Sequence, residues 1–552
     1  MSENNNTSFI PNDIVRKGLR PMNAAQNIPS PGTTVAYNPA TGEEIGQVPN
    51  TDMTQVPDMF ARARSAQAAW EQMSFTQRAA SIKKMRDYLV DNAAQIADIV
   101  SKSNGKTRID AMGTEVLPCT LACDWYAKNA GKVLKEKKIP IDSLLFFNKK
   151  SSMQHKALGV VGIISPWNYP LSIPFGEIIM GLMAGNAVIL KVAAATPLVG
   201  QVINDIIAAG NLPAGLFQQI VGSGGAVSRA FFENRIDKIF FTGSVGVGKQ
   251  LMSEAAETLT PLSLELGGND PMIVLKDADI ERATNGAAWA GFQNAGQSCG
   301  GVERVYVHES IFDEFVTLLA KKTNSLRHGA DNNHNVDIGC LTTKSQLNTV
   351  EQHLEDALTK GAKIVAQSQP IGPQNGYFHP ATLLTNTTDD MLFIKEETFG
   401  PLIPVIPFST EDEALSLAND SDLALTSSVW TKDLKNGRKL AAKLESGVTT
   451  INDHLYTHGL SEMPWGGWKH SGIGRTHGPE GLKEMTHTKA VNWDILPAKR
   501  NLWWYPFTES SFDALINAQR FVYPRSPKEF ATSAVKLTPF LVGKMFSKWK
   551  VK

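Results

Sequence analysis

Cys299 stands in the stretch FQNAGQSCGG, among small and polar residues, in a chain of 552 residues with four cysteines. A free cysteine is most often a small buried apolar residue, so this stretch alone leaves open whether Cys299 packs or acts as a sulfur nucleophile. Glu265, in LSLELGGNDP, lies between two leucines. Desolvation there raises a carboxyl pKa toward neutrality, as a general base needs, although a salt-bridged glutamate fits equally. Asn168, in SPWNYP, offers an amide for a developing oxyanion, or else a turn.

Two further stretches carry groups that suit a nucleotide. TGSVGVGK (242–249) follows the apolar run KIFF and precedes a helical pattern, so its backbone N–H groups can approach a phosphate. Its glycines are spaced G-x-x-G-x-G, which is neither the dinucleotide fingerprint nor the Walker spacing, and a tight turn fits equally well. In KEETFGPLIPV, Glu397 has a carboxylate for a sugar hydroxyl and Phe399 a ring to lie beside another ring.

The elements that must position these groups alternate between strand and helix. Residues 52–103 show helical spacing, and a second α/β pattern runs from about 278 to 465. Between Ala157 and Lys276, short apolar runs alternate with helical segments, which predicts a parallel sheet covered on both faces, with ligands beyond its carboxyl ends. The five runs span 159–165, 186–192, 218–222, 238–243 and 271–276.

Composition restricts the class of protein. With 54 basic and 54 acidic residues the chain has no overall electrostatic reason to bind nucleic acid. Its length indicates two or more domains. Cys119 and Cys123 have no second pair at zinc spacing, so we expect core packing and no metal site. Few cysteines, no signal-peptide pattern near the start and no bilayer-spanning apolar run lead us to expect a cytoplasmic protein.

Taken together, SPWNYP, VILK, FTGSVGVGK, LELGGNDP, NAGQSC, EETFGPL and PWGGWKHSGIGR resemble the motifs of the aldehyde dehydrogenase superfamily, in family order over about residues 34–494. The nearest subgroup oxidises semialdehydes or aliphatic, including long-chain, aldehydes. The resemblance implies an α/β fold with a Rossmann-like cofactor domain, an α/β catalytic domain and a β-arm that joins subunits into homodimers or homotetramers. The expected parts are a flexible lead (1–33), a cofactor domain (34–137 and 157–264), a catalytic domain (265–465), an arm (138–156 and 486–497) and an extension (498–552).

The same resemblance implies an NAD- or NADP-dependent, hydrolytic mechanism. Cys299 would attack the aldehyde carbon, and the Asn168 amide with the backbone N–H of Cys299 would hold the oxyanion. Loss of hydride leaves a thioester on Cys299, and Glu265 would activate the water that hydrolyses it. The residues implied in cofactor binding are Ser165, Trp167, Lys191, Gly224, Thr242, Gly243, Ser244, Leu266, Glu397 and Phe399.

The chain departs from the family pattern after Lys191. The family usually has Pro-Ser/Ala-Glu there, and the glutamate binds the adenine ribose 2′-hydroxyl, whereas this chain has Val192-Ala193-Ala194. Losing the carboxylate removes its repulsion of a 2′-phosphate, so we expect NADP to be accepted. A relative that passes the thioester to coenzyme A would not use Glu265, and an inert structural relative would not need the full catalytic set.

The substrate and the extension leave alternatives open. Arg304 is a candidate partner for the second carboxylate of succinate semialdehyde, but its stretch VERVYVH has a strand pattern and Arg304 could equally be structural. An aromatic rim formed by Tyr456, Trp465 and Trp468 favours an apolar aldehyde. We favour the apolar substrate. The extension is basic and aromatic from Arg520 onward, which suits contact with an anionic membrane surface. The alternative is a tail that packs on the enzyme or covers a neighbour's active-site entrance.

Overall fold

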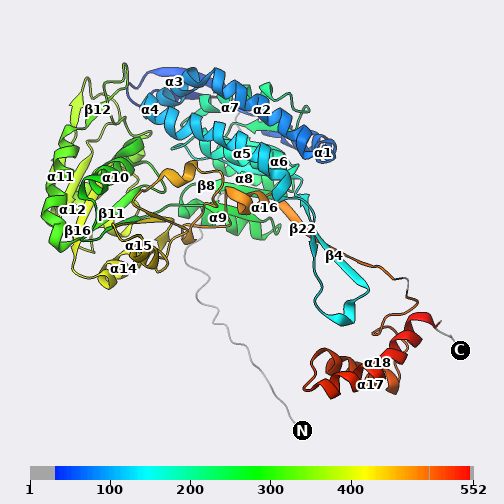
Figure 1. Ribbon diagram of the computed structural model, residues 1–552. Coiled ribbons are helices and arrows are strands. Elements are labelled where there is room, and N and C mark those ends of the chain that lie inside the picture. The colour runs from blue at the N-terminus through cyan, green and yellow to red at the C-terminus, as the bar shows by residue number, and fades with distance from the viewer. Residues whose placement is uncertain (1–31, 497, 548–552) are drawn as a thin grey trace, which may run out of the picture.

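The structure is a computed structural model that describes residues 32–496 and 498–547 (Figure 1). The expected flexible lead therefore lies almost wholly outside the described residues. Two lobes are each built around a sheet, and a long β projection leaves one of them and leads to a helical hairpin near the C-terminus (Figure 1). None of the described helices is long and apolar enough to cross a bilayer.

The first sheet has the strand order β21-β9-β8-β5-β6-β7. Every residue of β5, β6 and β8 is buried, and the pairings from β9 to β7 are parallel, as the continuous apolar runs predict. The strands are β5 (Val160–Ile164), β6 (Ala187–Lys191), β7 (Phe217–Ile220), β8 (Lys238–Thr242), β9 (Leu262–Glu265) and the antiparallel β21 (Gly472–Ile473).

Helices cover both faces of this sheet and bury one continuous apolar core with it. They are α1 (Val56–Glu71), α2 (Phe75–Asp91), α3 (Ala93–Asn104), α5 (Leu117–Val133), α6 (Ser172–Ala184), α7 (Pro197–Ala209), α8 (Gly224–Glu233) and α9 (Val245–Ala256). The helix α6 is buried along its whole length, which explains its nearly uniform apolar sequence.

The second sheet has the order β13-β15-β16-β11-β10-β18-β19 and its own core. The fifth apolar run of the sequence is its strand β10, so our assignment of that run to the first sheet was wrong. Hydrophobic continuity indicates a buried strand but does not say which sheet it joins. The strands are β10 (Asp270–Val274), β11 (Val302–His308), β13 (Lys363–Gln367), β15 (Thr382–Thr385), β16 (Leu402–Phe408), β18 (Thr426–Trp430) and β19 (Val448–Ile451).

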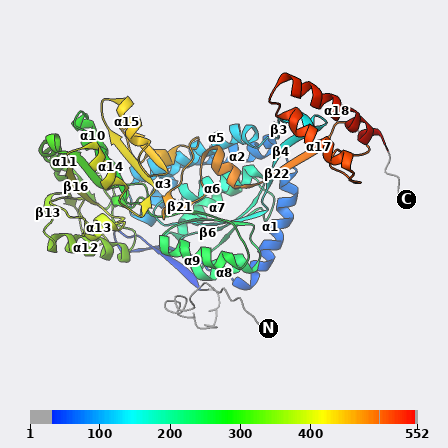
Figure 2. The ribbon, with the colours of Figure 1, turned by 90° about the horizontal axis from the view of Figure 1, so that it is seen from below.

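The projection is a three-stranded antiparallel sheet of order β22-β4-β3, which we call the arm. It consists of β3 (Lys137–Ile139), β4 (Lys149–Ala157) and β22 (Thr486–Asp494), with the short helix η3 (Leu144–Phe146) near its tip. Beyond it, α17 (Glu509–Val522) and α18 (Pro527–Phe546) pack on each other beside the arm (Figures 1 and 2).

The topology brings the candidate residues to one place between the lobes. Ser165 and Asn168 follow β5, Glu265 ends β9, and Cys299 lies in the loop before β11. The chain reverses ahead of Cys299 through a left-handed turn, where Asn294 and Ala295 have φ of 53° and Gly296 has φ of 72°. A Cβ at Gly296 would lie 2.2 Å from the backbone of Gly400, so only glycine allows this turn to pack.

Candidate active site

Cys299 belongs to the lining of three cavities of the protein. It lines an apolar tunnel, a larger cleft beside the first sheet, and a small cavity that also holds Glu265. Burial raises the pKa of the Cys299 thiol, and the nearby carboxyls of Glu397, Asp270 and Glu265 raise it further. The thiol is therefore protonated at neutral pH until a base or a positive charge acts on it.

Asn168 is buried in the loop after β5, and its Nδ2 donates to the carbonyl of Gln297 at 3.1 Å, two residues before the cysteine. Its backbone carbonyl accepts from three side chains: Lys106 Nζ at 2.8 Å, Asn294 Nδ2 at 3.0 Å and Asn104 Nδ2 at 3.4 Å. Lys106 in turn pairs with Glu115 at 2.7 Å, and neither side chain is exposed. The amide is thus positioned against the Cys299 loop by a buried network.

Glu265 is 5 % exposed, and neither carboxyl oxygen has a hydrogen-bond partner among the described residues. Burial raises its pKa well above the usual value, Glu177 raises it further, and Arg475 lowers it. Glu177 and His477 line the same cavity, each with an unpartnered polar atom. A carboxylate free of protein partners and facing Cys299 has the geometry of a base that holds water.

The cleft beside the first sheet has a volume of about 760 Å³ and collects ten of the thirteen candidate residues. These ten are Trp167, Asn168, Thr242, Gly243, Ser244, Glu265, Leu266, Cys299, Glu397 and Phe399. Ser165, Lys191 and Gly224 lie outside its lining: Ser165 follows β5, Lys191 ends β6, and Gly224 begins α8. Sequence reasoning missed Gln346 and Thr349 of α12 (Lys344–Thr359), which also line the cleft from the second lobe.

The residues present fit a dinucleotide. The helices α8 and α9 begin at the carboxyl ends of the first sheet without an acidic residue in their first turns. Ser244 caps α9 by accepting from the N–H of Val247 at 3.4 Å. Helix N-termini that carry no competing carboxylate attract a pyrophosphate.

The far wall of the cleft is fixed by two glutamates. Glu397 Oε1 accepts from the N–H of Gly268 at 3.1 Å, and Glu303 accepts from the N–H groups of Thr398 and Phe399 at 3.0 and 2.9 Å. Phe399 has φ of 53° and its ring meets that of Trp167 edge-on, with centroids 5.4 Å apart. The pair forms an aromatic boundary for a ring bound beside Cys299.

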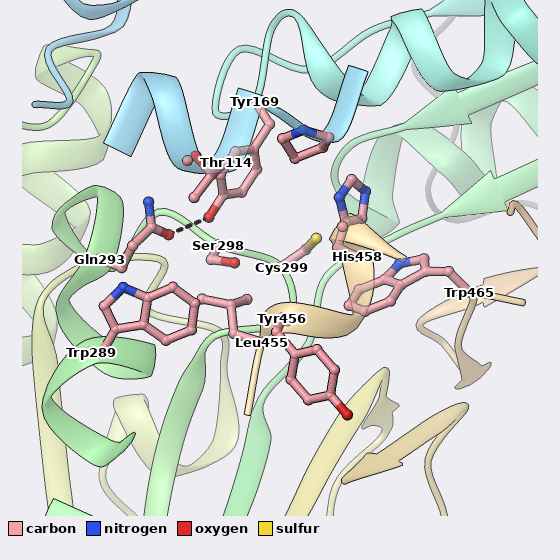
Figure 3. A pocket seen from close by; sticks show the side chains of 14 residues that line it. Thr114, Tyr169, Trp289, Gln293, Ser298, Cys299, Leu455, Tyr456, His458 and Trp465 are labelled. Atoms are coloured by element: carbon pink, nitrogen blue, oxygen red, sulfur yellow. Dashed lines mark hydrogen bonds between the residues drawn. The ribbon is translucent and has the colours of Figure 1, made fainter. Parts of the chain in front are cut away.

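The tunnel opens on the other side of Cys299 and has a volume of about 630 Å³ (Figure 3). Figure 3 shows the Cys299 sulfur on the side of the tunnel where His458 and Trp465 lie, with Trp289 and Leu455 along another part of the wall. Tyr169 donates to Gln293 Oε1 at 2.6 Å. All of its lining residues are described, and none is a lysine, arginine, aspartate or glutamate. Burial lowers the pKa of His458 to about 4, so this side chain is neutral as well.

The structure favours the structural alternative for Arg304, and one member of the expected aromatic rim was wrong. Arg304 is 1 % exposed and donates to the carbonyls of Asn269 and Ala418 at 2.8 and 3.1 Å, so it ties a strand to a neighbouring helix and does not reach the tunnel. Its side chain lines a separate hollow with Leu417 and Asn419, and Cys299 is not part of that lining. Trp468 lies exposed on β20 (Trp468–Lys469) outside the lining, while Tyr456 and Trp465 do line the tunnel.

Sequence reasoning also missed most of the tunnel wall. Tyr169 directly follows a motif residue and had a local signal, but Trp289, Leu455 and His458 come from α10 (Ile280–Phe292) and the loop around η6 (Tyr456–Gly459). Nothing in their own stretches indicates that these segments face each other, because they lie far apart in the sequence and come together only through the fold of the second lobe.

A cysteine between a cleft that fits a dinucleotide and an apolar tunnel is an arrangement suited to an oxidoreductase that acts through a covalent intermediate. Residues 28–491 match the Aldehyde dehydrogenase family. The chain is 36 % identical over 493 residues to a 4,4'-diapolycopene aldehyde oxidase of Methylomonas sp, which covers 89 % of this chain and 91 % of that protein. It is 34 % identical over 483 residues to a protein of Mycobacterium ulcerans named as a succinate-semialdehyde dehydrogenase [NADP(+)] 2, covering 87 % and 92 %.

Solved structures agree with the sequence comparison. The NAD⁺ complex of an aldehyde dehydrogenase from Bacillus cereus superposes with a TM-score of 0.79 at 33 % identity, covering 84 % of this chain and 94 % of that one. Lactaldehyde dehydrogenase from Escherichia coli gives 0.79 at 31 % identity, with 84 % and 96 % covered. The chain belongs to the aldehyde dehydrogenase family, and it is an NAD(P)-dependent aldehyde dehydrogenase.

Proposed function

We propose that this enzyme oxidises long or otherwise apolar aldehydes to carboxylic acids. The tunnel carries this proposal, because it leads to Cys299 between aromatic and aliphatic side chains and holds no cation for a second carboxylate. The cation beneath it, Lys106, lies behind the Tyr169 ring at 4.3 Å and is already paired with Glu115. An apolar chain gains roughly 0.8 kcal/mol for each methylene buried in such a tunnel.

In the proposed mechanism the Cys299 thiolate attacks the aldehyde carbon and forms a thiohemiacetal. The Asn168 amide and the Cys299 N–H stabilise the oxyanion, as preorganised donors do in a water-poor site. The nicotinamide supplies the hydride acceptor when NAD or NADP is bound. Glu265 then takes a proton from the water that attacks the thioester, which releases the acid and restores the sulfur nucleophile.

The proposed cofactor roles are those that the family resemblance implies, and seven of the ten residues line the cleft. We propose that Gly243, Ser244 and Gly224 hold the pyrophosphate at the two helix N-termini, and that Trp167 and Lys191 bind the adenosine half. Glu397 would bind the nicotinamide ribose, with Phe399 beside its ring. Ser165, Thr242 and Leu266 would complete the walls that the strand ends form.

We propose that the first lobe (34–137 and 157–264) is the cofactor domain and residues 265–465 the catalytic domain. The arm (138–156 and 486–497) would join subunits into a homodimer or homotetramer in the cytoplasm. Large apolar residues on the arm are exposed in the single chain, among them Ile139, Phe147 and Trp493. Analytical ultracentrifugation tests the assembly: a monomer at micromolar concentration would contradict it.

The substrate is tested by comparing kcat/KM for decanal and for succinate semialdehyde, each with NAD and with NADP. Cys299→Ala is the loss-of-function variant, and Cys123→Ala, which removes a buried cysteine outside the lining of the tunnel and the cleft, is the matched control. We expect decanal to exceed succinate semialdehyde at least tenfold in wild type and Cys123→Ala, with no turnover by Cys299→Ala.

Succinate semialdehyde is the second candidate, because several relatives are named for that activity. A preference for it would contradict the apolar-tunnel argument but leave the family and the nucleophile unchanged. Turnover by Cys299→Ala would contradict the covalent mechanism itself, whichever aldehyde is preferred.

A further inference from the structure

The C-terminal extension is a well-capped helical hairpin that stands apart from both lobes (Figures 1 and 2). The Thr508 side chain accepts from the N–H of Ser511 and begins α17, and the Ser526 side chain accepts from the N–H of Glu529 and begins α18. Such caps define where the two helices start.

The hairpin is fastened to the arm and has a very small core of its own. Asn148 Nδ2 donates to Asn501 Oδ1 at 3.4 Å, and the rings of Phe146 and Trp503 have centroids 5.2 Å apart. Among the described residues, the hairpin and the segment between it and the arm bury only four apolar side chains: Leu502, Ala514, Ala518 and Leu537. Leu145 of the arm packs against them. Because the core is so small, most large apolar side chains of this segment face solvent.

Four of these residues form a stripe along the outer side of α18. Val535, Pro539, Val542 and Phe546 follow a spacing of four, three and four, which places them on one side of a helix. Val535, Val542 and Phe546 are 73 %, 50 % and 67 % exposed. The stripe lies opposite the inner side, where Leu537 is buried, so α18 is apolar on two faces and the outer one has no partner in the described chain.

Aromatic residues are concentrated in the same segment. Of the fifteen exposed aromatic side chains among the described residues, eight lie between positions 501 and 546. They are Trp503, Trp504, Tyr505, Phe507, Phe512, Tyr523, Phe530 and Phe546. Tryptophan and tyrosine with one apolar and one polar side are the residues that collect at the boundary between lipid and water.

Charge separates this segment from the rest of the chain. Residues 498–552 hold ten Lys/Arg and three Asp/Glu, an excess of seven positive charges. Residues 1–497 hold 44 Lys/Arg and 51 Asp/Glu, an excess of seven negative charges. The net charge of zero is therefore the sum of two oppositely charged parts of the chain. An anionic lipid surface attracts the first part and repels the second, which orients the enzyme.

We propose that the α17–α18 hairpin is a docking element that binds the surface of an anionic lipid bilayer. The α18 stripe and the neighbouring aromatic residues would enter the interface, and the lysines and arginines would meet the phosphate groups. The hairpin would hold the enzyme beside the bilayer through the arm, whatever aldehyde the tunnel accepts. The combination of an unpartnered apolar stripe, clustered aromatic residues and positive charge favours lipid over a second copy of the protein.

The test is flotation of the full-length enzyme with vesicles of phosphatidylcholine alone or with about 30 % phosphatidylglycerol, at low and high salt. The variant is Val535→Asn/Val542→Asn/Phe546→Asn. Its matched control, Val90→Asn/Leu358→Asn/Leu434→Asn, replaces three exposed apolar residues on the two lobes and leaves the net charge unchanged.

We expect wild type and the control to float with anionic vesicles and to be released by high salt, and the stripe variant to partition at least about tenfold less. Turnover of a short, water-soluble aldehyde must be equal in all three proteins, which shows that they fold. Equal flotation of the stripe variant and wild type, or no flotation of wild type, would overturn the proposal. A lower oligomeric mass of the stripe variant would also overturn it, since the stripe would then be a subunit contact.

Discussion

Replacing Lys106 by methionine tests how the oxyanion donor is held in place. Lys106 and Glu115 are both fully buried with their charged atoms 2.7 Å apart. Glu115 also accepts from the backbone N–H groups of Leu171 and Ser172 at 2.9 and 2.8 Å, and Lys106 donates to the carbonyl of Asn168 at 2.8 Å. The Lys106–Glu115 pair therefore holds the backbone of Asn168, Leu171 and Ser172 in place.

The expected loss of stability depends on whether the substitution leaves a buried charge without a partner. Lys106→Met leaves an unpaired buried carboxylate, which costs about 3–5 kcal/mol. In Lys106→Met/Glu115→Gln the glutamine oxygen still accepts from the two backbone N–H groups, and no charge is buried, so we expect a loss of only about 1–2 kcal/mol. The two substitutions should thus be non-additive, with the double variant more stable than Lys106→Met.

The measurements are the thermal unfolding midpoint and the kcat of four proteins: the wild type, each single variant and the double variant. We expect Lys106→Met to lower the midpoint by about 3–10 °C and the double variant to recover most of that loss. The turnover number should fall about 10- to 100-fold in both proteins that lack Lys106, because neither restores its bond to Asn168. Additive midpoints, or a kcat that recovers together with stability, would refute the positioning role.

Three other variants test the site. Asn168→Ala should lower kcat about 10²- to 10³-fold with an unchanged unfolding midpoint, and a smaller effect would exclude its amide as the main oxyanion donor. Ala194→Glu restores a carboxylate at an exposed position after β6 and should lower the NADP/NAD ratio of kcat/KM at least tenfold; an unchanged ratio would contradict its role. Burial raises the pKa of Glu177 from 4.5 to about 8, so the unfolded chain ionises first and the folded enzyme loses stability as pH rises from about 5 to about 8. In Glu177→Gln the midpoint should fall less over that window, and parallel curves would show that Glu177 does not titrate there.

The parts of this site that the sequence predicted share one property: each is defined by its own short stretch. Glu265 at the end of an apolar strand, Ser244 before a helix and Asn168 after a strand follow from the local pattern together with the rule that ligands lie at the carboxyl ends of parallel strands. Their arrangement around Cys299 then follows from the family resemblance, which the comparisons confirm.

The parts that could not be predicted depend on contacts between distant segments. Trp289 and His458 line the same tunnel although they lie far apart in the sequence of the second lobe, and Arg304 was a candidate substrate ligand because sequence proximity to Cys299 was the sole guide. In a strand, neighbouring side chains alternate between opposite faces, so five residues of separation say little about direction. The assignment of β10 to the wrong sheet has the same cause, since periodicity records burial and not partners.

The electrostatics of the site explain why the nucleophile lies among acids. Three carboxyls, those of Glu265, Glu397 and Asp270, raise the pKa of the Cys299 thiol beyond what burial does, so the resting thiol is protonated and unreactive. A positively charged ring in the cleft beside Phe399 would oppose those carboxyls and favour the thiolate. In the proposed mechanism Glu265, whose carboxyl opposes ionisation of the sulfur, is also the base needed after the thioester forms. The three carboxyls would then keep the sulfur protonated before the cofactor binds, and Glu265 would act as a base once the acyl group is attached.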